Sequence, residues 1–243
     1  MEEVKEEKEE KEEKNYIILP DEYANFDLSF KLVVIGDSGV GKSCLTKRAT
    51  TNTFENFYSP TIGFEYYTFK IRMKDTDIRL QIWDTCGQET YRSLITSFYR
   101  NSSLAILVYS IDNKYSFKNL EVWLNELKVN SNPDVKIFLI GNKLDLENKR
   151  EVSNSEAENF KMENSINLFM EASAKSGFNA QEIFIEASRI LYDEYQKYKN
   201  DKDKNLNNFM NNNDINSNHQ LNLKNKNLDK KSSGRPRRKK QCC

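Results

Sequence analysis

The chain has 243 residues, and its 37 Lys and Arg residues balance its 37 Asp and Glu residues, so its formal net charge is zero. This balance excludes a uniformly basic nucleic-acid-binding protein, and we expect no nucleic-acid partner. No apolar run approaches the roughly 20 residues that a membrane-spanning helix needs, and no signal-peptide pattern stands at the N-terminus. The four cysteines form no disulfide framework, which indicates a reducing compartment.

The two ends of the chain carry opposite charge. Residues 1–14 contain eight Glu and four Lys, whereas residues 230–240 contain seven basic residues and no acidic one. The acidic run has no apolar face, so we expect residues 1–28 to form a charged, disordered extension. Residues 199–243 are rich in Asn and Lys, which predicts a disordered tail. One folded domain is expected between them, over residues 29–198.

Strand-like and helix-like segments alternate through this domain. Apolar runs predict six strands, at 30–36, 63–73, 77–84, 104–111, 135–141 and 166–171. The second and third strands flank a short polar turn and form a hairpin. Helical spacing predicts helices over 114–129 and 179–198. The alternation predicts an α/β fold, in which helices cover both faces of a six-stranded, mostly parallel sheet.

The first predicted strand ends in a phosphate-binding motif, "GDSGVGKS" at 36–43. Glycines let backbone N–H groups turn inward around phosphate oxygens, and the N-terminus of the following helix adds favourable partial charge. Lys42 is placed to reach the β- and γ-phosphates, and the Ser43 hydroxyl to bind Mg²⁺. The nucleotide-contacting residues that we expect here are Ser38, Gly39, Val40, Gly41, Lys42, Ser43 and Cys44.

A second motif, "GNKLDL" at 141–146, follows the fifth predicted strand. A carboxylate there can accept two hydrogen bonds from a guanine edge, which adenine does not offer in that place. Asp145 is placed for that role, and Asn142 and the Lys143 stem brace the ring. Such tetrapeptides are weak signals alone, since Asn and Asp populate many loops after strands. Together with "EASAKSG" at 171–177 and the phosphate loop, the signal becomes strong.

Two further segments carry residues suited to a γ-phosphate. In "WDTCGQE" at 83–89, Asp84 can hold Mg²⁺ through water, the Gly87 N–H can meet the phosphate, and Gln88 can orient an attacking water. In "FENFYSPTIG" at 54–63, Thr61 can give the metal a second hydroxyl, so this loop is a natural order–disorder switch. Trp83 is either a core aromatic residue or part of an exposed recognition surface.

These motifs, in this order, resemble the Ras superfamily of small GTPases, and among its branches the Rab branch, over roughly residues 29–197. "GDSGVGKS", "TIGFEY", "LQIWDTCGQETYRS", "LVYSI", "GNKLDL" and "EASAK" carry the resemblance. It implies the small GTPase P-loop fold, bound GTP or GDP, and Mg²⁺ held by Ser43, Thr61 and Asp84. The segments 58–63 and 86–98 would be switch I and switch II.

The resemblance also assigns roles outside the phosphate loop. Phe54 would flank the guanine ring, and Ser173, Ala174 and Lys175 would close over the base; Tyr58 is a further expected nucleotide contact. The implied effector surface comprises Ile62, Gly63, Phe64, Tyr66, Trp83 and Phe98, with Tyr66, Trp83 and Phe98 as the effector triad. The chain departs from common Rab patterns at "IGFEY", at Cys86 with "ETY", and at "FYRNSS", so familiar Rab partners do not follow.

The chain ends in Cys242 and Cys243, behind the basic run. Adjacent terminal cysteines resemble the Rab signal for two geranylgeranyl chains. One lipid chain binds a membrane only marginally, whereas two chains anchor stably, and basic residues favour an anionic leaflet. A nuclear-localisation patch and a metal-binding cysteine pair are the alternatives, and neither explains cysteines at the extreme end.

These expectations combine into one function. We expect a Rab-like GTP/GDP switch in vesicle traffic, on the cytoplasmic face of an intracellular membrane and cycling with the cytosol. It would hydrolyse GTP slowly, with Gln88 as the catalytic residue and with a GAP, an exchange factor, escort and dissociation-inhibitor proteins and effectors as partners. The alternatives are a nucleotide-locked binding module that barely turns over and a P-loop kinase or ATPase.

Overall fold

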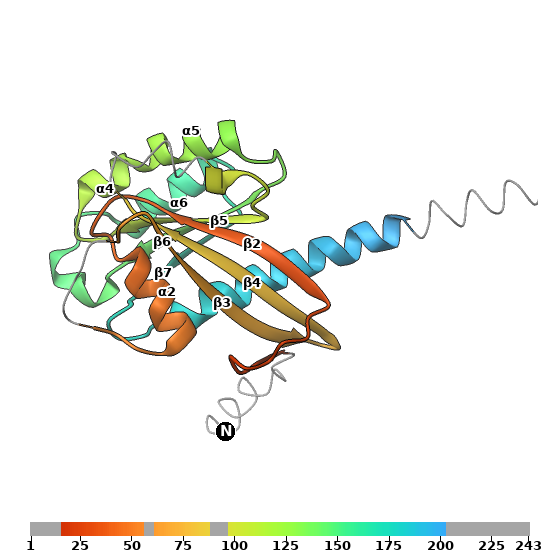
Figure 1. Ribbon diagram of the computed structural model, residues 1–243. Helices are drawn as coiled ribbons and strands as arrows, with labels where there is room; N and C mark the ends of the chain where they lie inside the picture. The colour runs from red at the N-terminus through yellow and green to blue at the C-terminus, as the bar shows by residue number, and fades with distance from the viewer. Residues whose placement is uncertain (1–15, 56–60, 88–96, 203–243) are drawn as a thin grey trace, which may run out of the picture. The chain divides into compact units, whose positions relative to one another are not determined.

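The computed structural model of the protein describes residues 16–55, 61–87 and 97–202 (Figure 1). The chain divides into two compact units between Tyr192 and Asp193. In the second unit, described residues 193–202 are helical, and Lys197 lies 3.8 Å from Glu194 across one helical turn. Among the described residues, no helix has the length and apolar character that crossing a membrane requires.

The first unit is built on a seven-stranded sheet in the order β1-β3-β4-β2-β5-β6-β7. The strands are β1 Tyr16–Ile18, β2 Leu28–Ile35, β3 Phe64–Met73, β4 Thr76–Thr85, β5 Leu104–Ser110, β6 Lys136–Asn142 and β7 Leu168–Glu171. Pairing is parallel from β4 through β2, β5 and β6 to β7, and antiparallel at β1–β3 and β3–β4. This mostly parallel sheet confirms the predicted α/β fold.

Helices cover both faces of the sheet (Figure 1). They are α2 Lys42–Thr51, α4 Lys114–Lys118, α5 Leu120–Asn130, the 3₁₀ helix η2 Leu144–Lys149, α6 Asn154–Glu163 and the helical residues 180–192. On one face, Leu32 and Val34 of β2 pack in a core with α2 and Phe184. On the other, Val33 and Ile35 pack in a second core with α5 and α6. Strands covered on both faces explain the continuous apolar runs in the sequence.

The parallel topology sets where the site lies. Strands β2, β4, β6 and β7 run parallel to one another, so their carboxyl ends meet at one edge of the sheet. These strands end at Ile35, Thr85, Asn142 and Glu171, directly beside the four predicted motifs. Ligands of open α/β sheets bind outside this edge.

The N-terminal segment differs from the prediction. Residues 16–28 do not belong to a disordered extension, because β1 pairs with the edge of β3, with Tyr16 opposite Met73 and Ile18 opposite Ile71. The sheet therefore has seven strands and not the six predicted. The apolar triplet "YII" is too short to predict a strand by itself, but it is sufficient for an edge strand. Residues 1–15 lie outside the described residues.

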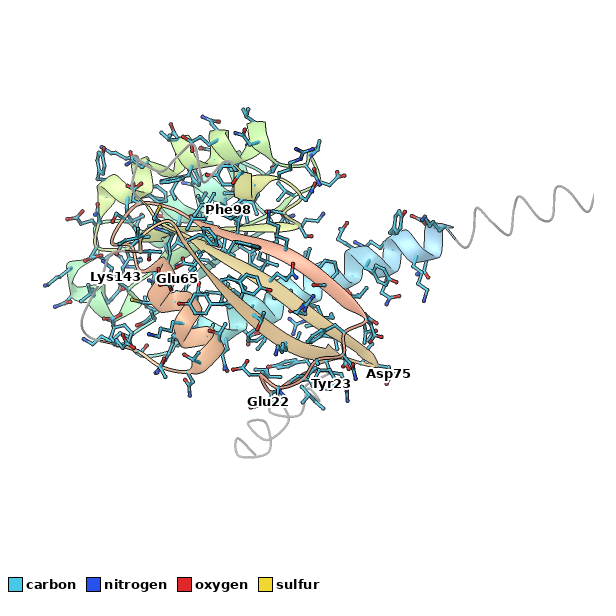
Figure 2. All side chains as sticks on the ribbon, viewed as in Figure 1. Glu22, Tyr23, Glu65, Asp75, Phe98 and Lys143 are labelled. Carbon is cyan, nitrogen blue, oxygen red and sulfur yellow. The ribbon has the colours of Figure 1, made fainter. Side chains whose placement is uncertain are left out.

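Residues 19–27 fasten this segment, which we call the strap (residues 16–27), to the β3–β4 hairpin. The Tyr23 hydroxyl donates to Asp77 and accepts from Arg72 Nη2 at 3.1 Å. The Phe26 ring lies 4.9 Å from the Arg79 guanidinium. Tyr23 lies at the end of the sheet opposite Lys143, so the strap is anchored away from the predicted nucleotide site (Figure 2).

The helices also correct the prediction in two places. The single helix predicted over 114–129 is divided at Asn119 into α4 and α5. Helix α6 was not predicted, although the Ser153-x-x-Glu156 signature precedes it. In the structure Ser153 and Glu156 form a reciprocal capping box that satisfies two backbone N–H groups at the start of α6.

Removing residues 1–27 is expected to destabilise the first unit by about 1–3 kcal/mol, because the strap's hydrogen bonds and the β1–β3 pairing are lost. Removing only residues 1–15 is the matched control and should leave the unfolding midpoint unchanged. Urea unfolding of both truncated proteins and the full chain measures the difference. Equal midpoints for all three proteins would contradict a stabilising strap.

Candidate functional site

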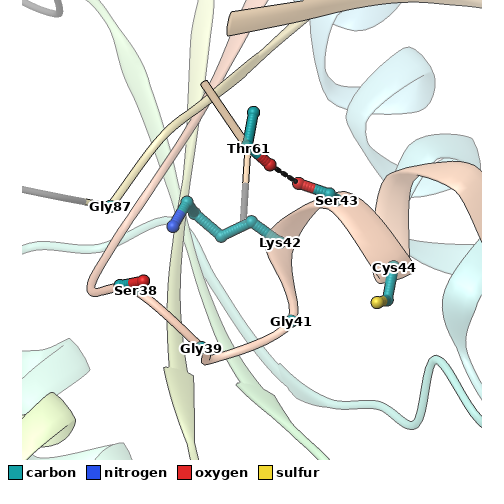
Figure 3. Close-up of a pocket in the computed structure, with 8 residues that line it drawn as sticks. All are labelled: Ser38, Gly39, Gly41, Lys42, Ser43, Cys44, Thr61 and Gly87. Atoms are coloured by element: carbon teal, nitrogen blue, oxygen red, sulfur yellow. Dashed lines mark hydrogen bonds between the residues drawn. The ribbon is translucent and has the colours of Figure 1, made fainter. Parts of the chain in front are cut away.

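The loop between β2 and α2 is shaped around its own lysine (Figure 3). Lys42 Nζ donates to the carbonyl oxygens of Gly36, at 2.9 Å, and Asp37, at 2.8 Å, so the side chain turns back across the loop. Gly41 precedes α2 with φ of 92°, a conformation that glycine adopts without strain. Helix α2 has no acidic residue in its first turn and no side-chain cap, so its N-terminal N–H groups are available to an anion.

A small cavity of about 20 Å³ opens between this loop and two neighbouring segments. It is lined by Ser38, Gly39, Gly41, Lys42, Ser43, Cys44, Thr61 and Gly87. The Lys42 side chain is 5% exposed. Burial lowers the pKa of Lys42 to about 8, against the opposing effect of the Asp84 and Asp37 carboxylates. A buried ammonium group of this kind is stabilised by a bound anion such as a phosphate.

Gly87 lets the end of β4 meet the phosphate loop. A Cβ atom added at Gly87 would lie 2.3 Å from both the Asp37 carbonyl carbon and the Ser38 nitrogen. No side chain fits at that distance, so the two backbones are in direct contact. The Gly87 backbone therefore borders the same cavity as Ser38 and Lys42.

Three oxygen-bearing side chains converge beside this cavity. The Ser43 hydroxyl oxygen lies 2.7 Å from Thr61 Oγ1 and donates to Asp84 Oδ2. Asp84 is fully buried, and its other oxygen, Oδ1, has no hydrogen-bond partner in the described part of the chain. Burial raises the pKa of Asp84 to about 6. Hard oxygen donors around an unsatisfied buried carboxylate fit Mg²⁺, which is held by few protein ligands together with phosphates.

A second cavity, of about 260 Å³, adjoins the first and shares Gly39, Gly41 and Cys44 with it. Its remaining lining residues are Phe54, Asn142, Lys143, Asp145, Ala174 and Lys175. Phe54 from the loop after α2 and Asp145 from η2 thus border the same space, although they are distant in sequence. A largely apolar cavity with one carboxylate suits a planar heterocycle that carries hydrogen-bond donors.

Asn142 joins the two cavities through its amide. Its Nδ2 donates to the Val40 carbonyl at 2.8 Å, and its Oδ1 accepts from the Ala174 N–H at 3.2 Å. Val40 itself lines neither cavity, since its side chain is buried in the core. Ser173 is also buried, and its hydroxyl donates to Asp145 Oδ1 at 2.6 Å. Val40 and Ser173 therefore hold the loops in place, whereas Asn142 both holds the loops and lines the second cavity.

Sequence reasoning missed the anchor of the phosphate loop. The Asp37 carboxylate accepts from Trp123 Nε1 at 2.7 Å and from Asn119 Nδ2 at 2.8 Å. Both partners belong to the α4–α5 region, more than 80 residues further along the chain. An Asp in a phosphate-binding loop would repel the ligand if it pointed inward, and these two donors hold it outward. No local sequence signal marks Trp123 for this role.

The predicted effector residues form an aromatic patch, which we define as Phe64, Tyr66, Trp83 and Phe98. The Trp83 ring lies 5.3 Å from Phe64, 5.2 Å from Tyr66 and 5.1 Å from Phe98. Phe64 and Tyr66 are 43% and 46% exposed, whereas Trp83 is half-buried. Trp83 is therefore neither a fully buried core residue nor fully exposed, and its role in recognition stays a prediction. Ile62, beside Gly63 at the start of the patch, is 83% exposed.

Several predicted residues lie outside the described residues: Tyr58, Gln88, Cys242 and Cys243. Gln88 directly follows the described Gly87, and Tyr58 precedes Thr61 by three positions. The described residues thus supply the phosphate loop, the three oxygen-bearing side chains of Ser43, Thr61 and Asp84, and the second cavity, which we call the base cavity.

A model of the Ras family matches residues 31–193 of the chain, about two thirds of its length. The match spans both cavities, the aromatic patch and every strand from β3 to β7, together with most of β2. The strap and the two charged ends lie outside it.

Asp84 is expected to make the ligand-free protein less stable above pH 6. Its pKa is raised in the folded state, so the folded protein binds the proton more tightly, and stability falls as pH rises from about 4 to about 6. Asp84→Asn should therefore stabilise the ligand-free protein by roughly 1–3 kcal/mol at pH 7 and by much less at pH 4.5. Thermal unfolding at both pH values, with Asp134→Asn at an exposed carboxylate as the control, measures this difference. Equal effects of Asp84→Asn at the two pH values would contradict the assignment.

Proposed function

Because this chain belongs to the Ras family of small GTPases, we propose that it is a Rab-like switch that regulates vesicle traffic on a membrane. The family supports guanine-nucleotide binding and GTP hydrolysis in general. The observation that carries the proposal for this chain is the pair of adjoining cavities, with Lys42 in the first and Asp145 in the second. Their shared wall at Gly39, Gly41 and Cys44 suits one ligand with a phosphate end and a base end.

The base end selects guanine in this proposal. A guanine ring beside Phe54 presents its N1–H and 2-amino group to the Asp145 carboxylate, whose position is fixed by the Ser173 hydroxyl. Charge-assisted hydrogen bonds of this kind are about twice as strong as neutral ones. Adenine has neither donor at those positions, so the site suits a GTPase better than it suits a P-loop kinase or ATPase. Competition between GTP and ATP for the site distinguishes these readings.

The phosphate end provides the chemistry. Lys42 and the N–H groups at the start of α2 bind the phosphates, and Mg²⁺ held by Ser43, Thr61 and Asp84 would neutralise charge on them. Gln88 orients the water that attacks the γ-phosphate, and the Gly87 N–H contacts the same group. By analogy with the family, a GAP would supply an arginine finger in trans and raise the rate by roughly 10³–10⁵. An exchange factor then replaces GDP with GTP.

Two linked segments are placed to respond to the γ-phosphate: the segment that carries Thr61 and the end of β4 next to Gly87. Thr61 lies on the cavity side, and two residues later the Gly63 carbonyl accepts from the Cys86 N–H at 3.0 Å. This backbone bond joins the segment after Thr61 to the end of β4, next to Gly87. A contact between Thr61 and the γ-phosphate would therefore also hold the end of β4 beside the phosphate. When hydrolysis removes the γ-phosphate, both segments would be released.

The aromatic patch is the proposed effector surface. Phe64 and Tyr66 are exposed on β3, and their rings contact Trp83 of β4. A shift of β3 or of the segment before it would therefore change the orientation of these rings. Exposed aromatic side chains are typical anchors of protein interfaces. With Ile62 and Gly63 they lie directly after Thr61 in sequence, so an effector that binds here senses the nucleotide state.

Membrane attachment completes the proposal. Cys242 and Cys243 would carry two geranylgeranyl chains, and the seven basic residues at 230–240 would favour an anionic leaflet. Escort and dissociation-inhibitor proteins would deliver and extract the lipidated chain. This places the protein on the cytoplasmic face of an intracellular membrane, in exchange with the cytosol.

The alternative is a nucleotide-locked binding module with negligible turnover. One observation favours it: Cys86 is buried, directly beside Gly87 at the end of β4. A larger side chain than the usual small residue at this position can restrict the movement of the β4 end. Turnover measurements separate the two readings.

Gln88→Leu is expected to retain GTP binding and to lose most hydrolysis, because the leucine side chain cannot orient the attacking water. Single-turnover hydrolysis of bound GTP by the wild type and the variant measures the rate. Calorimetric titration with a non-hydrolysable GTP analogue serves as the binding control. If both proteins hydrolyse GTP at the same rate, Gln88 has no catalytic role, and if neither hydrolyses it, the locked module is correct.

Replacing Cys242 and Cys243 by Ser is expected to move the protein from membranes to the soluble fraction without changing nucleotide affinity. Each single replacement should give intermediate, reversible association, because one lipid chain binds only marginally. The measurement is membrane fractionation with intact-mass analysis of the C-terminal peptide. An unmodified "QCC" peptide from membrane-bound protein would refute lipid attachment.

A further inference from the structure

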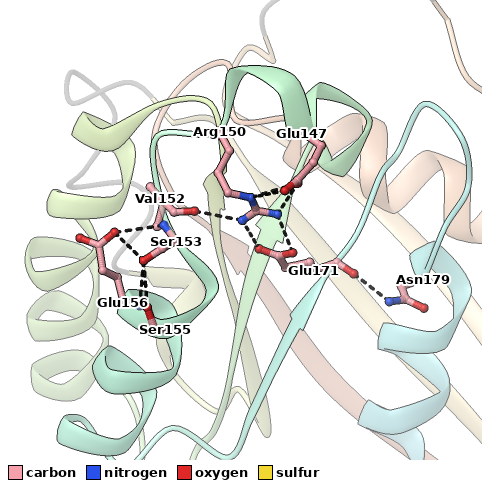
Figure 4. A network of polar contacts seen from close by, with 8 residues as sticks. All are labelled: Glu147, Arg150, Val152, Ser153, Ser155, Glu156, Glu171 and Asn179. Carbon is pink, nitrogen blue, oxygen red and sulfur yellow. Dashed lines mark hydrogen bonds and ion pairs between the residues drawn. The ribbon is translucent and has the colours of Figure 1, made fainter.

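Arg150, which follows η2, uses every N–H of its guanidinium (Figure 4). Nη1 and Nη2 donate to the two carboxylate oxygens of Glu171 at 2.6 and 2.8 Å. Nη1 also donates to the Val152 carbonyl at 2.9 Å. Nε and Nη2 donate to Glu147, at distances between 2.5 and 3.0 Å. All five donors of the planar group are satisfied, so its orientation is fixed.

The two carboxylates around Arg150 are not equivalent. The side chains of Arg150 and Glu171 are 18% and 12% exposed, whereas that of Glu147 is 62% exposed. A bidentate, mostly buried pair constrains geometry, whereas an exposed pair contributes little. The contact that matters is therefore Arg150 with Glu171.

This pair joins the two segments that border the base cavity. Arg150 ends the segment that begins after β6 and carries Asp145, and Glu171 is the last residue of β7, two positions before Ser173. The segments are also joined by the Leu144 N–H to the Ala172 carbonyl at 3.0 Å and by the Ser173 hydroxyl to Asp145. Arg150 thus adds a side-chain cross-link at the far end of the same pair of segments.

The Glu171 backbone is held independently of its side chain. Its carbonyl accepts from Asn179 Nδ2 at 2.8 Å. A change confined to the Glu171 carboxylate therefore leaves that bond in place and alters only the link to Arg150.

We propose that Arg150 is a positioning residue for guanine recognition, which holds the Asp145 segment and the Ser173 segment in register through Glu171. The proposal rests on the proposed function, since it assigns Asp145 to the guanine edge. Arg150 does not contact the base. It acts on the orientation of the Asp145 carboxylate, because the two ends of the Asp145 segment are tied to the same neighbouring segment.

GDP and inosine diphosphate differ only at the 2-amino group of the base, so comparing their affinities tests the register of Asp145. GDP offers Asp145 both N1–H and the 2-amino group, whereas inosine diphosphate offers only N1–H. A carboxylate in correct register accepts both bonds and prefers GDP, and a displaced carboxylate loses that preference. A general loss of structure would weaken both nucleotides equally, since their phosphates and ribose are identical.

The experiment measures the affinities of the full-length protein for GDP and inosine diphosphate by calorimetry. Arg150→Gln and Glu171→Gln are each expected to reduce the GDP preference by about tenfold, which corresponds to about 1.4 kcal/mol. Arg150→Lys keeps the charge but not the fork and should fall between wild type and Arg150→Gln. Glu147→Gln is the matched control, and its preference should equal that of wild type.

Asp145→Asn separates this proposal from the function on which it rests. If Asp145→Asn leaves the GDP preference unchanged, the guanine assignment is wrong and the Arg150 proposal falls with it. If Asp145→Asn abolishes the preference while Arg150→Gln and Glu171→Gln preserve it, only the Arg150 proposal is overturned. Equal weakening of both nucleotides by Arg150→Gln, or failure of that variant to fold while Glu171→Gln keeps the preference, also overturns it.

Discussion

The site is organised around two buried charges of opposite sign that the protein alone does not satisfy. Lys42 and Asp84 are both buried, and burial lowers the pKa of Lys42 to about 8 and raises the pKa of Asp84 to about 6. Among the described residues, the Lys42 ammonium donates to two backbone carbonyls, and Asp84 Oδ1 has no hydrogen-bond partner. A phosphate beside Lys42 and a cation beside Asp84 would remove both costs together. This explains why one ligand that carries phosphates with Mg²⁺ suits the site better than either ion alone.

The rest of the fold holds these two groups at one edge of the sheet. Lys42 begins α2 after β2, and Asp84 lies near the end of β4, which pairs with β2 in parallel. Backbone contact at Gly87 brings the β4 end against the phosphate loop, and Trp123 with Asn119 turns the Asp37 carboxylate away from it. Asn142 then connects this loop to the base cavity. The two cavities are therefore bordered by loops that are bonded to one another, whereas Thr61, Phe64 and Tyr66 lie on β3 and the segment directly before it.

Two additions extend this framework. The strap adds β1 to the outer edge of β3 and is anchored through Tyr23 and Phe26, at the end of the sheet opposite Lys143 (Figure 2). It covers an edge that would otherwise present unpaired backbone groups for association with other chains. The Arg150–Glu171 pair lies at the opposite end of the sheet order, where β7 leads into the base cavity. The first addition protects the fold, and the second concerns how accurately the base is recognised.

The sequence by itself determined the α/β class, the phosphate loop and the base motif, because each is encoded by local spacing: a strand, a glycine-rich turn and a helix start. Lys42, Ser43 and Asp145 could be named because each stands in a short motif at a fixed place after a predicted strand. Only the tertiary structure decided what depends on distant partners. The Asp37–Trp123 bond and the Arg150–Glu171 pair join residues 86 and 21 positions apart. β1 is three residues long and becomes a strand only because the edge of β3 satisfies its backbone hydrogen bonds.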